Sequence, residues 1–421
     1  MDNLIIIGAG LSGLGAANHL KEYEIYESNS YPGGHAYSHK QKDLYWDEGA
    51  HICHSKNNDY LNLILKNIEF HHEKNTLNNN LYYGAKVGYP IQNNLKDLGF
   101  EDKVKALVSL HKIKNFNPSS IKNYRDWLKA SYGDFITENF YEVFTKKYWN
   151  CKTSELSLDW LKGRLIQPNI EKIIRGSFEK QNQEDTVFSE FYYPKNNGYF
   201  GFYKNHFSSK KINFNHKVHK INCKNKVITF KNGVNINYDK IISSIPLKDM
   251  GGIVAEMPKS IKAKLHGLRA TQGLYVNLTL GHKIFKEHWL YIYDENIKIS
   301  RLFSQSNMSN NKTIFQVQLE LYYDEKTKIN INKEIETAIN DFVRLFKLKR
   351  NEINYVGHLY KKYSYVVADL NRVSNSSPAI NWLEENHIYQ VGLYGRWKYI
   401  WSDEAYLSGY KMAQKISNSI Y

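Results

Sequence analysis

The sequence has little cysteine, little proline and fewer acidic than basic residues, and each shortage excludes a class of protein. Only three cysteines, Cys53, Cys151 and Cys223, occur in 421 residues, and no two form a CxxC pair. An odd and widely spaced set predicts neither a disulfide framework nor a zinc or other metal site. With only 8 prolines and no low-complexity tract, long disordered linkers are not expected either.

Long hydrophobic runs are also missing. No stretch of 18 apolar residues occurs, and the apolar run near the N-terminus is too short for a signal peptide and follows no basic segment. We therefore expect a cytoplasmic protein without a transmembrane segment.

Acidic residues number 42 against 57 lysines and arginines, which gives a formal net charge of +15. Such an excess favours an anionic partner: a nucleotide, a nucleotide sugar, nucleic acid or an acidic membrane surface. The basic residues are scattered, whereas nucleic-acid-binding proteins cluster them on one face. A solvated basic surface explains most of the excess, and we do not expect nucleic acid as the partner.

A nucleotide-binding fingerprint begins the chain. Residues 4–7 form a short apolar run typical of a buried parallel strand, and residues 14–20 after the turn read as a helix. Between them stands a GxGxxG turn, in which one glycine makes the turn, one admits a pyrophosphate and one packs the helix on the sheet. A second strand ends in Glu27, which is placed to accept hydrogen bonds from a ribose. The predicted contacts of the turn are Gly8, Gly10, Leu11, Ser12 and Gly13.

FAD and NAD share this fingerprint, and the segment after Glu27 distinguishes them. Gly33, Gly34 and His35 follow a Tyr-Pro pair at the position where a group of FAD enzymes has a second glycine pair. The chain therefore resembles the amine oxidases, protoporphyrinogen oxidases, phytoene desaturases and UDP-galactopyranose mutases, and we expect non-covalent FAD.

Hydrophobic periodicity organises the remaining chain into separated segments. It predicts an α/β fold with a Rossmann-type FAD-binding domain assembled from separated segments, a helical insert and an antiparallel-sheet insert. The FAD-binding domain comprises residues 1–85, 190–250 and 375–421. Residues 86–189 form the helical substrate-side insert, and residues 251–374 form the antiparallel-sheet substrate domain. Helices are expected at 58–70, 95–113, 121–180, 333–346 and from Asp403; a hairpin is expected at 213–219 and 226–232, and a strand at 240–246.

Five segments resemble UDP-galactopyranose mutase along nearly the whole chain. Gly49-Ala50-His51-Ile52-Cys53-His54 is similar to the family segment GAHIFH, and 144–149 resembles its YTEKQWG helix. Trp160–Arg164 and the pair 289–293 and 299–304 resemble the stretches that supply two arginines. The terminal segment Gly395-Arg396-Trp-Lys-Tyr399, followed by Asp403, resembles the family's GR…YKY…D motif.

The resemblance implies roles for these residues. Arg301, Arg164 and Tyr399 would hold a substrate diphosphate, although Arg175 downstream could take the place of Arg164. His51 would lie against the flavin. Further cofactor contacts are implied at Gly49, Ala50, Gly395, Arg396 and Asp403.

In the implied reaction, reduced flavin N5 attacks the anomeric carbon of a nucleotide sugar and expels the diphosphate. The sugar then recloses with the other ring size, without net redox change, for surface polysaccharide synthesis. NAD(P)H or a flavin reductase would supply the electrons that reduce the flavin. The oligomeric state is left open, with a homo-oligomer as one alternative.

Three departures keep other functions open. Ser243-Ser244-Ile245-Pro246 is closer to the strand end of the oxidases, residues 400–402 precede Asp403 as extra residues, and 165–185 lack the bacterial uridine-binding pattern. A flavin oxidase or desaturase acting on an amine, porphyrinogen or polyene is the alternative. A non-catalytic flavin-binding or nucleic-acid-binding protein is a third possibility.

Overall fold

Strands from three distant parts of the chain form one parallel sheet. In the computed structural model, which describes residues 3–113, 120–166, 168–180 and 188–418, this sheet has the order β19-β13-β1-β2-β9. The apolar run of β1 (Leu4–Ile7) is fully buried and lies between β13 (Lys240–Ser243) and β2 (Glu24–Tyr26). The edges are β19 (Ile388–Gln390) and β9 (Ile212–Asn213). The prediction of a Rossmann-type domain assembled from separated segments is confirmed.

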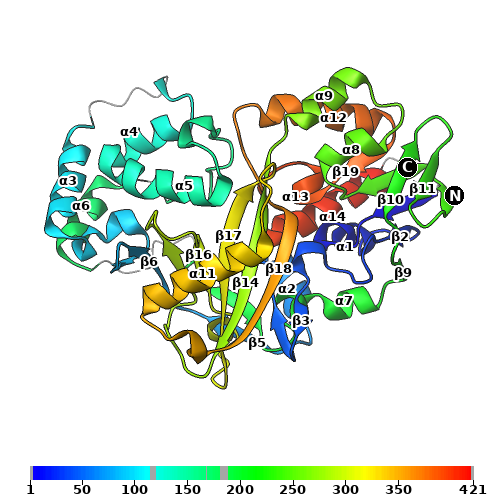
Figure 1. Cartoon of the computed structure of the whole chain (residues 1–421). Helices are drawn as coiled ribbons and strands as arrows, with labels where there is room; N and C mark the ends of the chain where they lie inside the picture. Colours follow the sequence, from blue (N-terminus) through cyan, green and yellow to red (C-terminus); the bar gives the residue numbers. More distant parts are fainter. Residues whose placement is uncertain (1–2, 114–119, 167, 181–187, 419–421) are drawn as a thin grey trace.

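Glycine allows the first and the last long helix to cross closely beside this sheet. Helix α1 (Leu11–Ala17) packs against α14 (Ser402–Asn418), and Figure 1 shows the two side by side. A Cβ atom on Gly409 would lie 1.8 Å from the carbonyl oxygen of Ser12, and one on Gly13 would lie 2.0 Å from that of Gly8. Side chains are therefore excluded at both positions.

Smaller elements complete this lobe. An antiparallel ribbon contains β10 (Val218–Asn222), β11 (Val227–Phe230) and β12 (Asn235–Asn237), so the predicted hairpin exists, with its first strand starting later than expected. Helices α8 (Leu247–Ile253), α9 (Lys259–His266) and α12 (Arg372–Glu385) pack together next to it. The predicted helix 58–70 is shorter, because α2 (Asn58–Leu65) ends and β5 (Phe70–Glu73) pairs with β8 (Phe191–Pro194).

A seven-stranded sheet stands in the middle of the molecule (Figure 1). Its long antiparallel strands are β18 (Ile353–Val366), β14 (Ala270–Leu280) and β17 (Phe315–Asp324), followed by β16 (Arg301–Phe303) and β15 (Trp289–Ile292). The apolar side of α11 (Ile331–Phe346) covers one face. The sheet continues into β6 (Asn78–Tyr82) and β7 (Ala85–Gly88), and the expected boundary between residues 85 and 86 falls within β7. The place of β6 in the sheet is not visible in the sequence pattern, because polar residues, Asn78 and Asn80, are the buried ones.

The helical lobe lies on the far side of this sheet from the parallel sheet (Figure 1). It contains α3 (Phe100–His111), α4 (Tyr124–Ile136), a π turn (Thr137–Tyr141), α5 (Glu142–Trp149) and α6 (Ile170–Phe178). The predicted helical stretch 121–180 is interrupted, because Asn150 adopts a left-handed conformation with φ of 51° and ends α5. Parts of the expected insert, residues 114–119, 167 and 181–187, lie outside the described residues.

Within the described ranges, no helix combines the length and the apolar character needed to cross a bilayer.

Candidate active site

One large cavity lies where the three parts of the chain meet. Its volume is about 780 Å³, and its wall includes residues of the glycine turn, of the seven-stranded sheet and of the helical lobe. Cavities of this size are typical of sites for small molecules and cofactors.

The nucleotide end of the cavity is formed by two glycine segments. Gly8, Gly10, Leu11 and Ser12 line it, and the backbone of Gly10 pairs with that of Gly33 in an isolated bridge. A Cβ atom on Gly10 would meet only the Cα atom of Gly34, at 3.8 Å, so this backbone stays accessible from the cavity. An exposed glycine backbone at the carboxyl end of β1 fits a pyrophosphate. Gly34 and His35 line the same wall, whereas Gly13 serves the packing of α1.

Glu27 follows β2 and lines this end of the cavity. Its Oε2 accepts a hydrogen bond from the Ala9 amide at 2.8 Å, and its Oε1 accepts one from the Asn29 amide at 2.8 Å. The carboxylate thus fixes the glycine turn. Oε1 also accepts hydrogen bonds from the Asn29 side-chain amide at 2.8 Å and the Ser28 hydroxyl at 3.0 Å. Only Oε2, with a single donor, therefore keeps a lone pair for a ribose hydroxyl.

The Gly49-Ala50-His51 segment lines the middle of the cavity and is held by the seven-stranded sheet. The Gly49 amide donates to Gln318 Oε1 at 3.1 Å, and the Ala50 amide donates to Glu320 Oε1 at 2.8 Å. His51 Nδ1 lies 3.1 Å from the Gly49 carbonyl oxygen. Because Gln318 and Glu320 both belong to β17, the sheet insert sets the position of a loop that belongs to the nucleotide-binding lobe.

A buried carboxylate beside this loop has three basic neighbours. Glu48 is fully buried and pairs with Lys361, while His39 and His35 lie 2.7 Å and 3.3 Å from it. Burial opposes ionisation of Glu48, but the His39 hydrogen bond and the charges of His35 and Lys361 prevail and lower the pKa of Glu48 to about 2. Burial also lowers the pKa of His35 to about 4. Sequence reasoning missed this cluster, because Lys361 belongs to a distant strand.

Arg301 enters the cavity wall from β16 and is paired with a buried carboxylate. Its Nε and Nη2 donate to the two oxygens of Glu320 at 2.8 Å and 3.0 Å, and Glu320 is fully buried. Burial disfavours the charge on Arg301, but Glu320 outweighs burial and raises the pKa of Arg301 above its ordinary value. An arginine has five N–H donors; two bind Glu320 and the Tyr291 hydroxyl is a further partner, so at most two remain for a ligand.

Arg164 enters the same cavity from the segment after α5. Its Nη2 donates to Glu404 Oε2 at 2.5 Å and to the Tyr399 carbonyl oxygen at 3.1 Å. Its Cζ atom lies 4.1 Å from the Trp401 ring centroid and 4.8 Å from that of Tyr399. Arg175, which the sequence offered in place of Arg164, is exposed and pairs with Glu171. It does not belong to the cavity wall that the described residues form.

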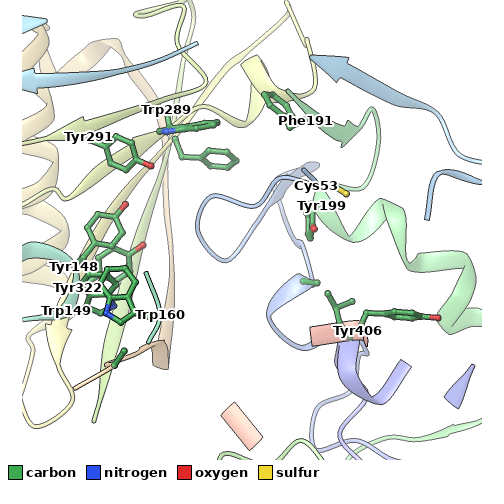
Figure 2. Packing of buried hydrophobic residues seen from close by; sticks show 14 of the residues in the cluster. Cys53, Tyr148, Trp149, Trp160, Phe191, Tyr199, Trp289, Tyr291, Tyr322 and Tyr406 are labelled. Carbon is green, nitrogen blue, oxygen red and sulfur yellow. The ribbon is translucent and has the colours of Figure 1, made fainter. Parts of the chain in front are cut away.

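Aromatic side chains make up much of the wall around the arginines. Figure 2 shows Tyr148, Trp149 and Trp160 gathered with Tyr322 in this cluster. Burial raises the pKa of Tyr399, although Arg164 and Arg301 oppose it, so its hydroxyl stays protonated and can donate. The aromatic residues of this part of the wall include Tyr148, Trp149, Trp160, Tyr291, Tyr365, Tyr399 and Trp401.

Several donors in this wall lack a partner among the described residues. They are Arg164 Nη1, the Tyr148 hydroxyl and the indole nitrogens of Trp149 and Trp160. Buried polar groups without partners are costly, and an indole N–H can only donate. Neighbouring atoms cover these groups, so an oxygen-rich ligand would satisfy them after small shifts of the surrounding rings.

Three predicted cofactor contacts near the C-terminus lie outside the described wall of this cavity. Gly395 packs between Gln390 and Ser243, and Arg396 pairs with Glu384 at 3.1 Å. Asp403 accepts a hydrogen bond from Ser55 at 2.5 Å. Neighbouring Ser402 and Ala405, in the first turn of α14, do line the cavity, so this helix begins at the wall.

The three-segment parallel sheet, the paired glycine turns and the deep cavity define a dinucleotide-binding enzyme fold with a helical insert and an antiparallel-sheet insert. The model of the family described as flavin containing amine oxidoreductase matches residues 11–417. The chain therefore belongs to this family of flavin-dependent enzymes. The glycine cradle, the carboxylate of Glu27 and the size of the cavity fit FAD as the flavin.

Solved structures share the fold over the whole chain. A reduced UDP-galactopyranose mutase superposes with a TM-score of 0.93 at 21% identity, covering 99% of this chain and 96% of that one. A putative protoporphyrinogen oxidase from Exiguobacterium sp. follows with a TM-score of 0.77 at 12% identity and 99% coverage of each chain. The cyclohexylamine oxidase from Brevibacterium oxydans gives 0.69 at 13% identity, covering 100% and 99%. The suspected likeness to UDP-galactopyranose mutase is thus confirmed at the level of the fold.

Proposed function

We propose that this enzyme is a nucleotide-sugar mutase that interconverts pyranose and furanose ring forms, as its resemblance to UDP-galactopyranose mutase implies. The observation that carries the proposal is that Arg164 and Arg301, from two different inserts, reach the wall of one cavity whose other end is the glycine cradle. A cleft that holds a flavin and presents two buried guanidinium groups is suited to a second, anionic ligand.

The arginines would bind the substrate diphosphate and stabilise it as a leaving group. Charge develops on the diphosphate as the glycosidic bond breaks, so donors already fixed in place favour the transition state. Glu320 holds the Arg301 fork from one edge and leaves its other edge for phosphate oxygens, which is the bidentate geometry that arginine provides. Tyr399, with its protonated hydroxyl, would add a neutral donor.

The aromatic wall would exclude water and support the sugar. Trp149 and Trp160 lie 4.8 Å apart between ring centroids, at 6.0 Å and 6.2 Å from Tyr399, and their unpartnered indole N–H groups suit sugar oxygens. Bound in reduced form, the flavin would supply the nucleophile for the anomeric carbon. We further propose NAD(P)H or a flavin reductase as electron source, a cytoplasmic location and a role in surface polysaccharide synthesis.

Turnover of UDP-galactose with and without dithionite tests this function. The expected result is ring interconversion only with reduced flavin, with no reductant consumed per turnover. No interconversion by the reduced holoenzyme, or stoichiometric oxygen consumption with an amine or a porphyrinogen, would contradict it.

A second candidate is a flavin oxidase or desaturase, and Lys361 favours it. Oxidases of this fold often place a lysine near flavin N5. Lys361 lines the cavity and pairs with Glu48, the residue that precedes Gly49 in the sequence. Replacing Lys361 with methionine separates the two functions. If the enzyme is an oxidase, the Lys361→Met variant should lose the reaction of its reduced flavin with oxygen. If it is a mutase, turnover of the variant should still depend on Arg301.

A further inference from the structure

A long part of the nucleotide-binding lobe is rich in lysine and free of acidic residues. Residues 191–238 contain nine lysines and no aspartate or glutamate, in a chain whose formal net charge is +15. Neutral residues separate these lysines, so no basic run marks them in the sequence. The stretch includes all three strands of the ribbon β10, β11 and β12, and Figure 1 shows β10 and β11 at the edge of the molecule away from the helical lobe. The positive charge is therefore concentrated on one part of the surface.

The ribbon has an apolar inner face and a lysine-bearing outer face. Its inner face packs into the core of this lobe next to α8, through Val218, Ile221, Ile228 and Phe230. Lys220 pairs with Thr229 across the strands, so both side chains lie on the outer face. Lys231 follows Thr229 by two residues and shares that face, and its amide donates to the carbonyl oxygen of Lys217 at 2.8 Å. Lysines from both strands thus meet on one side of the ribbon.

Four lysines form what we call the basic face of the ribbon: Lys217, Lys220, Lys231 and, in the turn between β10 and β11, Lys224. All four are exposed, and none forms an ion pair with a residue in the described ranges. The acidic residues that border the ribbon, Asp239 and Glu256, accept hydrogen bonds from the backbone amides of Asn3 and Cys223 at 2.7 Å and 3.0 Å. Unpaired charges of one sign repel each other, so this face favours an anionic partner.

The residue types of the ribbon distinguish among anionic partners. Residues 191–238 contain no arginine, and the aromatic residues of the ribbon, Phe230 and Tyr238, are buried. Nucleic acids are bound through arginine forks and through exposed rings on which bases stack, and protein interfaces favour arginine and aromatic residues over lysine. Lysines on the flat face of a sheet suit a surface with spread negative charge, such as a bilayer that contains anionic lipids.

An apolar side chain accompanies the lysines at the end of the ribbon. Val234 lies in the turn between β11 and β12, three residues after Lys231, and is 39% exposed. A small apolar residue flanked by lysines can enter the headgroup region of a bilayer while the ammonium groups contact lipid phosphates. The tip of the ribbon therefore fits the same partner as its basic face.

We propose that the basic face of the ribbon binds the surface of a membrane that contains anionic lipids. Each lysine close to such a surface strengthens binding about fivefold, so four lysines favour it roughly several hundredfold over a neutral bilayer. One such patch without a lipid anchor gives reversible binding that salt weakens. Lys220, Lys224 and Lys231 do not belong to the wall of the active-site cavity, whereas Lys217 does. The inference is therefore independent of the proposed function, and Lys217 is left unchanged in its test.

Co-sedimentation of the FAD-loaded protein with vesicles tests the binding. The wild type should bind vesicles of phosphatidylcholine with about one third phosphatidylglycerol at about 0.05 M salt, and should leave them at about 0.5 M, where charges are screened. The triple variant Lys220→Gln, Lys224→Gln, Lys231→Gln should bind these vesicles roughly a hundredfold more weakly. Its flavin absorbance and melting temperature should stay unchanged, since the three side chains are exposed.

A matched variant separates the basic face from total charge. Lys283→Gln, Lys286→Gln, Lys312→Gln removes the same charge from exposed positions of the sheet insert and should bind anionic vesicles nearly as well as the wild type. A wild type that does not bind anionic vesicles, or that binds pure phosphatidylcholine equally well, would overturn the proposal. A matched variant that loses as much binding as the ribbon variant would also overturn it. Binding of single-stranded RNA that the ribbon variant loses, by a wild type that does not bind vesicles, would overturn it in favour of nucleic acid.

Discussion

Removal of Arg301 provides the sharpest test of the site, and the structure changes what the sequence alone leads one to expect. From sequence, Arg301→Ala should lower turnover by roughly a hundred- to a thousandfold and leave folding and FAD content intact. In the structure the guanidinium neutralises Glu320, a carboxylate that solvent does not reach. Arg301→Ala therefore leaves a buried charge whose remaining partners are the Tyr322 hydroxyl at 2.6 Å and the Ala50 amide at 2.8 Å.

The expected magnitude follows from the pair. Breaking a buried ion pair from one side costs about 3–5 kcal/mol of unfolding free energy, whereas removing both charges costs far less. Arg301→Ala should thus be clearly destabilised, and Arg301→Met combined with Glu320→Gln should recover most of the loss. The surface control Arg350→Ala, which breaks an exposed pair with Glu336, should cost at most about 1 kcal/mol.

Urea unfolding of the four proteins at one fixed FAD excess measures these differences, because bound cofactor itself adds stability. UDP binding and UDP-galactose turnover are measured on the same samples. The double variant should fold and hold FAD yet lose about 3–4 kcal/mol of transition-state stabilisation, or roughly a hundred- to a thousandfold in rate. Arg301→Lys should recover only part, since a point charge lacks the fork. If the double variant binds UDP and turns over like the wild type, Arg301 does not hold the diphosphate.

Two further perturbations test other parts of the cavity, and a third tests a buried lysine outside its wall. Gly10→Val should abolish FAD binding, because its side chain would occupy the pyrophosphate position; yellow protein that releases FAD on denaturation would contradict this. Tyr399→Phe should keep the fold and lower turnover by about tenfold, the value of one hydrogen bond to a charged group; unchanged kcat would contradict its role as a donor. Lys147 donates to three carbonyl oxygens, including that of Ile292 at 3.0 Å, and burial lowers its pKa to about 8 from 10.5. The unfolded chain then binds more protons between these values, so Lys147 should make stability rise with pH from about 8 to about 10.5; urea unfolding across this range should show a flatter profile for Lys147→Met.

The nucleotide-binding part of the fold was predictable because its signals are local. The apolar run 4–7, the glycine turn and Glu27 follow one another within 24 residues, and the physics of a strand, a tight turn and a helix terminus constrains each. The family resemblance added Arg164 and Arg301, and both do line the cavity. Their roles toward a substrate remain predictions.

Partners from distant strands could not be predicted. Nothing near Glu320 in sequence shows that it faces Arg301, because the contact depends on the register between β16 and β17. The Glu48–Lys361 pair and the Gln318 contact to Gly49 likewise join separate lobes. Patterning also failed where a strand is polar, as in Asn78–Tyr82, since the buried Asn80 side chain there donates to the carbonyl oxygens of Val87 and Gly88 instead of contributing to an apolar face.

The interleaved order of the parallel sheet has a consequence for biosynthesis. As the ribosome releases the chain, β1 emerges before the other strands of this sheet. Its partner β13 comes 236 residues later, by the register that pairs Ile7 with Ser243, and β19, which pairs with β13, comes later still. The crossing helix α14, whose Gly409 fits against α1, is made after all of these strands. A nascent chain stopped before residue 388 would have its helical and sheet inserts but no completed cleft beside α1. Cofactor capture should therefore be a late event, and a truncated polypeptide should be recognisable to the cell by its inability to retain flavin.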